Sequence, residues 1–144
     1  MEEAAATLAE TKLTARVRAV IALRLEQNRP HKEAIRRAMA VLALPTNAAA
    51  AAKCTARTVD AILHAAGDRS ADFSWYTKRA LLAAIYSATV LYWVRDSSED
   101  DAATLAFLDR RMTWLGRLFR LRARFDGLVA RLPRPRRLRM GDTG

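Results

Sequence analysis

The chain has 144 residues and a mass of 16.1 kDa, a size typical of one domain. Hydrophobic residues make up 51% of it and charged residues 28%, with 5 Gly and 4 Pro, which excludes a disordered, collagen-like or low-complexity chain. The one cysteine, Cys54, cannot form an internal disulfide, so we expect a reducing compartment. The acidic segment from Met1 to Ala6 resembles neither a secretory signal nor an Arg-rich transit peptide, so we expect no import signal here.

The net charge of +10 is concentrated toward the C-terminal end. Between Arg110 and Arg139, eleven arginines stand against a single acid, Asp126, and the rest of the chain is neutral. Such a basic segment indicates an anionic partner, either a membrane surface or a nucleic acid. Composition alone leaves both open.

Helical spacing recurs along the chain and no segment alternates with a period of two, so the sequence predicts an all-α fold. The first helix carries Leu13, Val17 and Ile21 on one face and should end near Pro30. A second, short helix follows and should stop before Pro45, because the residue before a proline is pushed out of the helical region.

The third helix should begin in the alanine run at 48–52 and end at Gly67. Cys54 lies within this helix and is predicted to be a small packing residue. The helical spacing predicts a buried stripe made of Val59, Ile62, Leu63 and Ala66.

The fourth helix should start at Asp72 or Ser74 and run to about Arg95. Its segment Ala80–Val94 contains fifteen residues without a charge. A bilayer span needs about 20 such residues, so the segment predicts a buried central helix instead. Its bulky side chains leave two alternatives open, an apolar pocket beside the helix or ordinary core packing.

The segment Ser97–Asp101 predicts the start of a fifth helix, since serines cap helices and acids favour the positive end of the helix dipole. The spacing leaves open whether this helix continues past Gly116. Pro133 and Pro135 should end regular structure, with a disordered tail over 134–144. The buried face of the fifth helix is predicted to carry Leu105, Leu108, Met112 and Leu115.

The segment from Trp114 to Leu132 is predicted to be amphipathic, with one narrow apolar stripe bordered by arginines. This pattern is typical of a helix that lies in a membrane interface. Packing on the core and nucleic-acid binding are the alternatives, although nucleic acid would not require the apolar stripe. The predicted membrane contacts are Trp114, Leu118, Leu121, Phe125, Leu128, Arg117, Arg124 and Arg131.

No residue pattern for catalysis, for a metal or for a bound cofactor appears in the sequence. The two histidines, His31 and His64, and the lone cysteine lack metal-ligand spacing. Asp60 lies four residues before His64, which allows either an acid–base couple or a plain surface pair. The sequence alone therefore shows no catalytic constellation.

Two adjacent aromatic residues, Trp75 and Tyr76, open the fourth helix. Neighbours on a helix point about 100° apart, so at least one of the two should be exposed, where aromatic side chains favour protein contacts. The alternative is that Trp75 folds under the preceding loop and only Tyr76 stays at the surface.

Three stretches resemble a known family: Ala66 to Tyr86, Arg95 to Ser98, and Phe107 to Arg111. They resemble the coenzyme Q (ubiquinone) biosynthesis accessory family of lipid-binding proteins, which assists the di-iron demethoxyubiquinone hydroxylase. The resemblance is gapless over about Ala66 to Met112 and weaker upstream from about Lys12.

The resemblance implies an all-helical dimer like the ligand-binding domain of TetR-type regulators, which binds isoprenoid quinone intermediates and is not an enzyme. It further implies a C-terminal amphipathic helix that reaches the membrane and a surface patch that contacts the hydroxylase. The patch positions that match are Asp72, Trp75, Tyr76 and Arg79. The lipid-binding positions expected around the fourth helix are Leu81, Leu82, Ile85, Tyr86, Thr89 and Trp93.

Family members carry an N-terminal helix-turn-helix region, which the few residues before Lys12 cannot contain. The Ala- and Arg-rich composition with no import signal leads us to expect a bacterial member that is cytoplasmic and peripheral on the inner membrane. We expect a lipid-binding and dimerisation domain over 1–113, a membrane-interface helix over 114–132 and a basic tail over 133–144. A TetR-like regulator that binds nucleic acid through the arginine cluster, or a plain helical structural subunit, are the alternatives.

Overall fold

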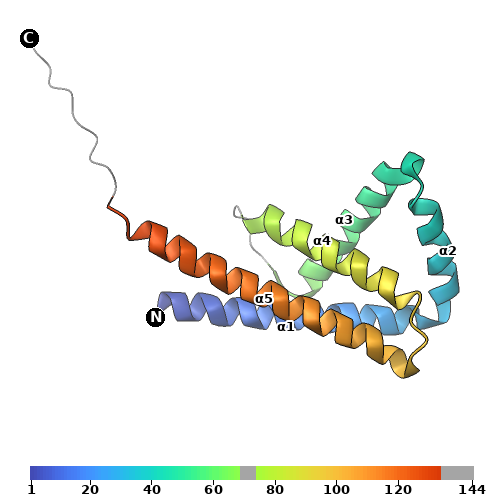
Figure 1. Cartoon of the computed structure of the whole chain (residues 1–144), viewed down its shortest axis with the longest axis horizontal. Coiled ribbons are helices and arrows are strands. Elements are labelled where there is room, and N and C mark those ends of the chain that lie inside the picture. The colour runs from blue at the N-terminus through green and yellow to red at the C-terminus, as the bar shows by residue number, and fades with distance from the viewer. Residues whose placement is uncertain (69–73, 134–144) are drawn as a thin grey trace, which may run out of the picture.

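The computed structural model of the chain describes residues 1–68 and 74–133, and within these ranges it contains helices and no strand. The all-α prediction is confirmed, whereas the TetR-like arrangement stays a prediction. The long helices are α1 (Glu2–Asn28), α2 (Lys32–Leu42), α3 (Ala48–Ala65), α4 (Ser74–Trp93) and α5 (Ala102–Ala130) (Figure 1). Three short 3-10 helices precede α2, α3 and α5: η1 (Arg29–His31), η2 (Pro45–Asn47) and η3 (Glu99–Asp101).

The predicted ends of the helices are confirmed where the chain is described. α1 stops immediately before η1, which contains Pro30, and α2 stops three residues before Pro45. After α3 the chain turns at Gly67, whose φ of 79° lies in the left-handed region that glycine adopts without strain. α4 begins at Ser74, and the alternative start at Asp72 lies outside the described residues, as does the tail predicted to be disordered.

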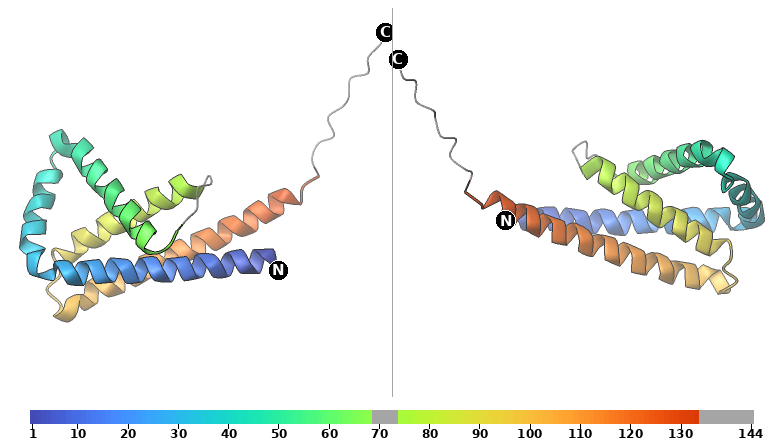
Figure 2. Two further views of the ribbon diagram at one scale, coloured as in Figure 1. Left: turned by 180° about the vertical axis from the view of Figure 1, so that it is seen from behind. Right: turned by 45° about the horizontal axis from the view of Figure 1, so that its top comes forward.

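The helices form a bundle with a projecting arm. α1 and α5 lie side by side, and α4 crosses them on one side, in all three views (Figures 1 and 2). α2 and α3 form the arm at the end of the bundle opposite the N-terminus (Figure 1). The core lies where α1, α3, α4 and α5 meet and consists of Val17, Ile21, Leu25, Val59, Ile62, Leu63, Ala66, Leu82, Ile85, Val90, Trp93, Leu108, Met112 and Leu115.

The prediction that α4 is surrounded on every side is wrong. Leu91 is 49% exposed and Tyr92 40% exposed, and Ala80 and Ala84 are also at the surface. The reason is the small number of helices, because α1, α3 and α5 make the main contacts with α4 in the described chain. One apolar side of α4 is therefore uncovered.

α5 continues without a break through Gly116, a point that the sequence left open. Its first half carries the buried residues Leu108, Met112 and Leu115, as predicted. The expected core domain and the expected membrane helix thus share one continuous helix.

The turn between α4 and α5 is held by a buried carboxylate. Asp101 accepts hydrogen bonds from Trp93 Nε1 at 3.0 Å, from Lys32 Nζ at 3.0 Å and from Arg29 Nε at 3.1 Å. Burial alone would raise the pKa of Asp101, but the hydrogen bonds from Lys32, Trp93 and Arg29 outweigh burial and hold its pKa below the usual range. The carboxylate thereby joins the start of α2, the end of α4 and the start of α5.

A second carboxylate, Asp96, caps α5. Its Oδ2 accepts hydrogen bonds from the backbone N–H of Thr104 at 2.9 Å and from the Thr104 hydroxyl at 2.6 Å. Ser98 Oγ accepts the N–H of Ala103 at 3.0 Å, so one of the predicted serines binds the first turn of α5, although Asp101 occupies the N-cap position. Burial acts to raise the pKa of Asp96, but the hydrogen bonds from Ser98 and Thr104 hold it far below the usual range.

Replacing Asp101→Asn should lower the free energy of unfolding at pH 7 by about 2–4 kcal/mol, because Lys32 and Arg29 lose a buried counter-charge. A carboxyl with a depressed pKa stabilises the fold above its unfolded pKa of about 4 and ceases to do so as the pH falls through its folded pKa. The difference between the wild type and D101N should therefore shrink below about pH 4. Urea unfolding followed by circular dichroism measures the difference in unfolding free energy and its dependence on pH. A difference that does not change with pH would contradict the stabilising role of the ionised Asp101 carboxylate.

Candidate functional site

The distal half of α5, residues 114–130, exposes a row of large apolar side chains. Trp114 is 52% exposed, and Leu121, Phe125 and Leu128 are each about two-thirds exposed. Leu118 is half-buried at the inner edge of this row. Single exposed apolar residues are ordinary, but a row of them along one helix marks an interaction surface.

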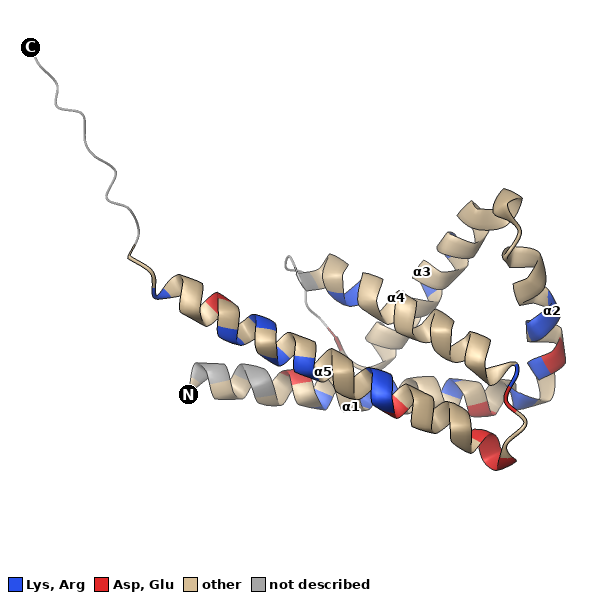
Figure 3. Cartoon of the chain, in the orientation of Figure 1, with Lys and Arg blue, Asp and Glu red and all other residues tan. Residues whose placement is uncertain are grey.

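Arginines accompany this apolar row. Arg117, Arg124 and Arg131 are exposed, and Figure 3 shows the basic residues gathered along the distal half of α5 and the acidic ones at its start. Asp126 is the one acid of this half and lies 3.9 Å from Arg122. Seven of the eight predicted membrane contacts thus lie on one continuous helix, Arg131 directly follows its last residue, and all of the eight except Leu118 are exposed.

The six residues predicted to bind lipid lie on the inner side of α4. Leu82, Ile85, Thr89 and Trp93 are buried, and Leu81 and Tyr86 are half-buried against the core. Some of their polar groups have structural partners. The Thr89 hydroxyl donates to the carbonyl of Ile85 at 2.7 Å, and the Tyr86 hydroxyl accepts from Arg24 Nε at 3.1 Å.

A small cavity between α1, α4 and α5 lies beside this face. Its volume is about 20 Å³, and Leu82 is the one predicted lipid contact that lines it. A space of this size holds about one water molecule, so a larger ligand would have to part the three helices. The cavity is lined by Glu10, Leu13, Thr14, Val17, Leu63, Lys78, Leu82, Met112, Leu115 and Phe119.

Sequence reasoning missed the ion pair at this cavity. Lys78 Nζ lies 3.1 Å from Glu10 Oε1, and the Lys78 side chain is only 10% exposed. The sequence did indicate that Lys78 points inward, because it lies four residues before Leu82 and so shares the inward face of α4. The pair gives an otherwise apolar cavity one polar wall.

At the start of α4, the predicted partner-binding residues form an aromatic and cationic patch. Tyr76 is 72% exposed, and its ring meets the half-buried Trp75 ring edge-on at 4.7 Å between centroids. The Arg79 guanidinium lies 3.7 Å from the Trp75 ring centroid, within the range of a cation–π contact. Asp72 lies outside the described residues.

Asp60 belongs to this patch and not to a pair with histidine. Its Oδ1 accepts a hydrogen bond from Arg79 Nε at 2.7 Å, which joins α3 to α4. Cys54 is exposed, so its prediction as a packing residue is wrong; the first half of α3 projects in the arm, beyond the core. Among the described residues, no group of His, Cys, Asp and Glu is arranged to hold a metal.

Residues 48–118, which span α3, α4 and the first half of α5, match the COQ9 family. Over 96 residues the chain is 42% identical to the human ubiquinone biosynthesis protein COQ9, mitochondrial, and the match covers 67% of this chain and 30% of the human protein. A protein of the same name from Schizosaccharomyces pombe is 40% identical over 106 residues, 74% of this chain and 42% of the yeast protein. The chain belongs to the COQ9 family over this region.

The COQ9 match confirms the family resemblance derived from the sequence. It includes the patch at Trp75 and Tyr76 and the face of α4 from Leu81 to Trp93, but it ends at residue 118, before most of the exposed row of α5. The chain spans less than half the length of these two COQ9 relatives, and both are mitochondrial by name. No helix in the described part of the chain is long and apolar enough to cross a membrane.

Proposed function

We propose that this COQ9 family chain is a non-catalytic accessory protein of ubiquinone biosynthesis that binds isoprenoid quinone intermediates at a membrane surface. The observation that carries the proposal is the exposed apolar row on the distal half of α5, with arginines beside it. Such a helix lies in the plane of a membrane, with its apolar side among the acyl chains and its arginines at anionic head groups.

Membrane contact accounts for both the exposed apolar row and the arginines on the distal half of α5. A nucleic acid would use the arginines and leave Phe125 and Leu128 without a role. Packing against the core would bury the apolar row, yet Leu121, Phe125 and Leu128 stay about two-thirds exposed in the described chain. We therefore propose that the protein is peripheral on a membrane surface. Its Ala- and Arg-rich composition is the reason to propose the cytoplasmic side of a bacterial inner membrane.

We propose that the isoprenoid lipid enters between α1, α4 and α5 by enlarging the small cavity beside Leu82. Apolar side chains from all three helices would contact the isoprenoid chain. The Glu10–Lys78 pair supplies a polar contact for the quinone end of the lipid.

The proposed protein partner is the di-iron demethoxyubiquinone hydroxylase, which would contact the patch of Trp75, Tyr76 and Arg79. Exposed tyrosine and partly exposed tryptophan beside an arginine are the residue types that dominate protein interfaces. The Arg79 side chain is already held by Asp60, so the patch has a defined shape before a partner binds.

A second copy of the chain is the proposed occupant of the uncovered side of α4. This side is apolar, and Tyr92 stacks there on Phe107 of α5 with 4.8 Å between the ring centroids. Leu91 and Arg95 lie beside the stacked rings. A homodimer through this side would cover the apolar surface that the chain itself leaves open.

The double change Phe125→Asp and Leu128→Asp should lower the affinity for anionic vesicles by at least about 100-fold, because it removes two apolar side chains whose burial contributes about 1.5–3 kcal/mol each. Vesicle flotation measures the affinity. The matched control is Val41→Asp with Leu44→Asp, two similarly exposed apolar residues at the α2–α3 corner, which should bind as the wild type does. DNA binding that is unchanged in F125D/L128D and weakens steeply with increasing salt would instead favour a TetR-like regulator that binds nucleic acid.

Isoprenoid quinone intermediates should be recovered by mass spectrometry of lipid extracted from the purified protein. Leu82→Phe overfills the cavity and should deplete them several-fold. Leu108→Phe is the control, because it overfills the core at a residue that does not line the cavity. Equal lipid content in the two variants, or no isoprenoid lipid in the wild type, would contradict the lipid-binding role.

Tyr76→Ala should weaken capture of the hydroxylase by about tenfold, as expected for an exposed aromatic anchor. Leu44→Ala removes a comparably exposed apolar side chain far from the patch and should leave capture unchanged. Pull-down with purified hydroxylase measures the effect, and equal capture by both variants would rule out the patch.

A further inference from the structure

A groove runs between the first turns of α1 and the distal half of α5. The two helices lie alongside each other there (Figure 2). The groove between them has a volume of about 570 Å³. This is within the usual range for ligand sites, about 300–1,000 Å³, although the groove is open to one side. Its walls are formed by Met1, Ala4, Leu8 and Thr11 from α1 and by Arg120, Ala123 and Arg124 from α5.

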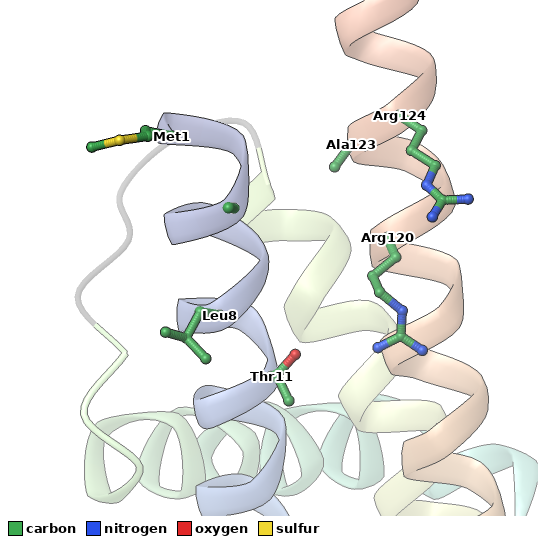
Figure 4. Close-up of a pocket in the computed structure, with 7 residues that line it drawn as sticks. Met1, Leu8, Thr11, Arg120, Ala123 and Arg124 are labelled. Carbon is green, nitrogen blue, oxygen red and sulfur yellow. The ribbon is translucent and has the colours of Figure 1, made fainter.

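The groove combines apolar walls with two arginines. Figure 4 shows Ala123 pointing toward α1 and the side chains of Arg120 and Arg124 along the near face of α5, with the guanidinium group of Arg124 on the side away from α1; both arginines line the rim of the groove. Leu8 extends the apolar wall along α1 and is 55% exposed. The groove therefore offers an apolar strip next to a pair of donors.

Neither arginine is neutralised within the described chain. Arg120 and Arg124 form no ion pair with any side chain that the structure describes, a set that leaves out the acidic side chains of the first turn of α1, whereas the nearby Asp126 lies against Arg122. Two like charges spaced four residues apart on a helix repel each other, so an anion between them would be favoured. A phosphate matches the planar fork of a guanidinium and can accept two hydrogen bonds from each.

We propose that this groove binds the phosphate head group of one anionic phospholipid, with the first part of an acyl chain along Ala4 and Leu8. The inference rests on the proposed membrane association and adds α1 to the membrane surface that α5 forms. The volume suits a head group and the start of one chain and is too small for a whole phospholipid, so the bound lipid stays part of the bilayer.

Selective binding is measured by flotation with vesicles of pure phosphatidylcholine and with vesicles containing phosphatidylglycerol. At about 0.5 M NaCl, long-range attraction is largely screened, so a remaining preference reports short-range contacts. The wild type should prefer phosphatidylglycerol by about tenfold, and Arg120→Gln with Arg124→Gln should reduce this to less than about twofold. Arg36→Gln with Arg37→Gln makes the same charge change on α2 and should keep the preference.

A second pair of variants tests the groove without changing charge. Ala123→Phe fills the groove and should abolish the preference, whereas Ala130→Phe, an exposed residue two turns further along α5, should retain it. Circular dichroism checks that all variants are folded. A preference that survives both R120Q/R124Q and A123F would overturn the head-group site.

These experiments distinguish a failure of the proposed membrane association from a failure of the proposed head-group site. If the wild type binds neither kind of vesicle, both proposals are refuted. If the wild type binds, F125D/L128D abolishes binding, and the wild type shows no preference at high salt, then membrane association stands and the groove is refuted. Equal loss of preference in A123F and A130F would likewise refute the groove alone.

Discussion

The Asp101 carboxylate is the interaction on which the arrangement of the helices depends. It lies in the turn before α5, yet two of its three donors come from the junction of α1 and α2, about 70 positions earlier. The third, Trp93, ends α4 and is fully buried in the core. Asp100 and Asp101 adopt the left-handed backbone region, with φ of 51° and 56°, which costs a non-glycine residue about 1–2 kcal/mol. The hydrogen bonds to Asp101 offset that cost, and they fix where α5 begins and in which direction it runs.

The direction of α5 determines where the functional surfaces lie. Its first half fills the core through Leu108 and Met112, and the ion pair of Arg18 with Asp109, at 2.7 Å, ties it to α1. Its distal half then leaves the core in the same line, beside the first turns of α1 (Figure 1). The exposed row of α5 and the groove with Arg120 and Arg124 both result from this continuation.

Much of the fold could be predicted from the sequence, because the signals were local. Pro30, Pro45 and Gly67 mark helix ends through backbone restrictions that act within one or two residues. The buried faces of α3 and α5 follow from helical periodicity, which needs no knowledge of the partner helices. The COQ9 resemblance was likewise carried by contiguous residues.

The features that could not be predicted from the sequence depend on contacts between distant segments of the chain. Nothing near Asp101 in the sequence indicates that Arg29 and Lys32 bind it, and nothing near Asp60 indicates Arg79. Periodicity also could not tell that α4 has an uncovered side, since a run of apolar residues looks the same whether the chain or a second molecule covers it. The size of the cavity beside Leu82 depends on how side chains from three helices fit together, which spacing does not encode.

The unbroken course of α5 through Gly116 has a mechanical consequence. A helix without a proline or a kink behaves as a stiff rod over its length, about 44 Å for 29 residues. Once the distal half lies in the plane of a bilayer, the bundle has no joint about which to swivel, and its tilt against the bilayer is set. The start of α4 then stands at a fixed height and angle above the lipid surface, so a membrane-bound partner would meet it in one orientation only.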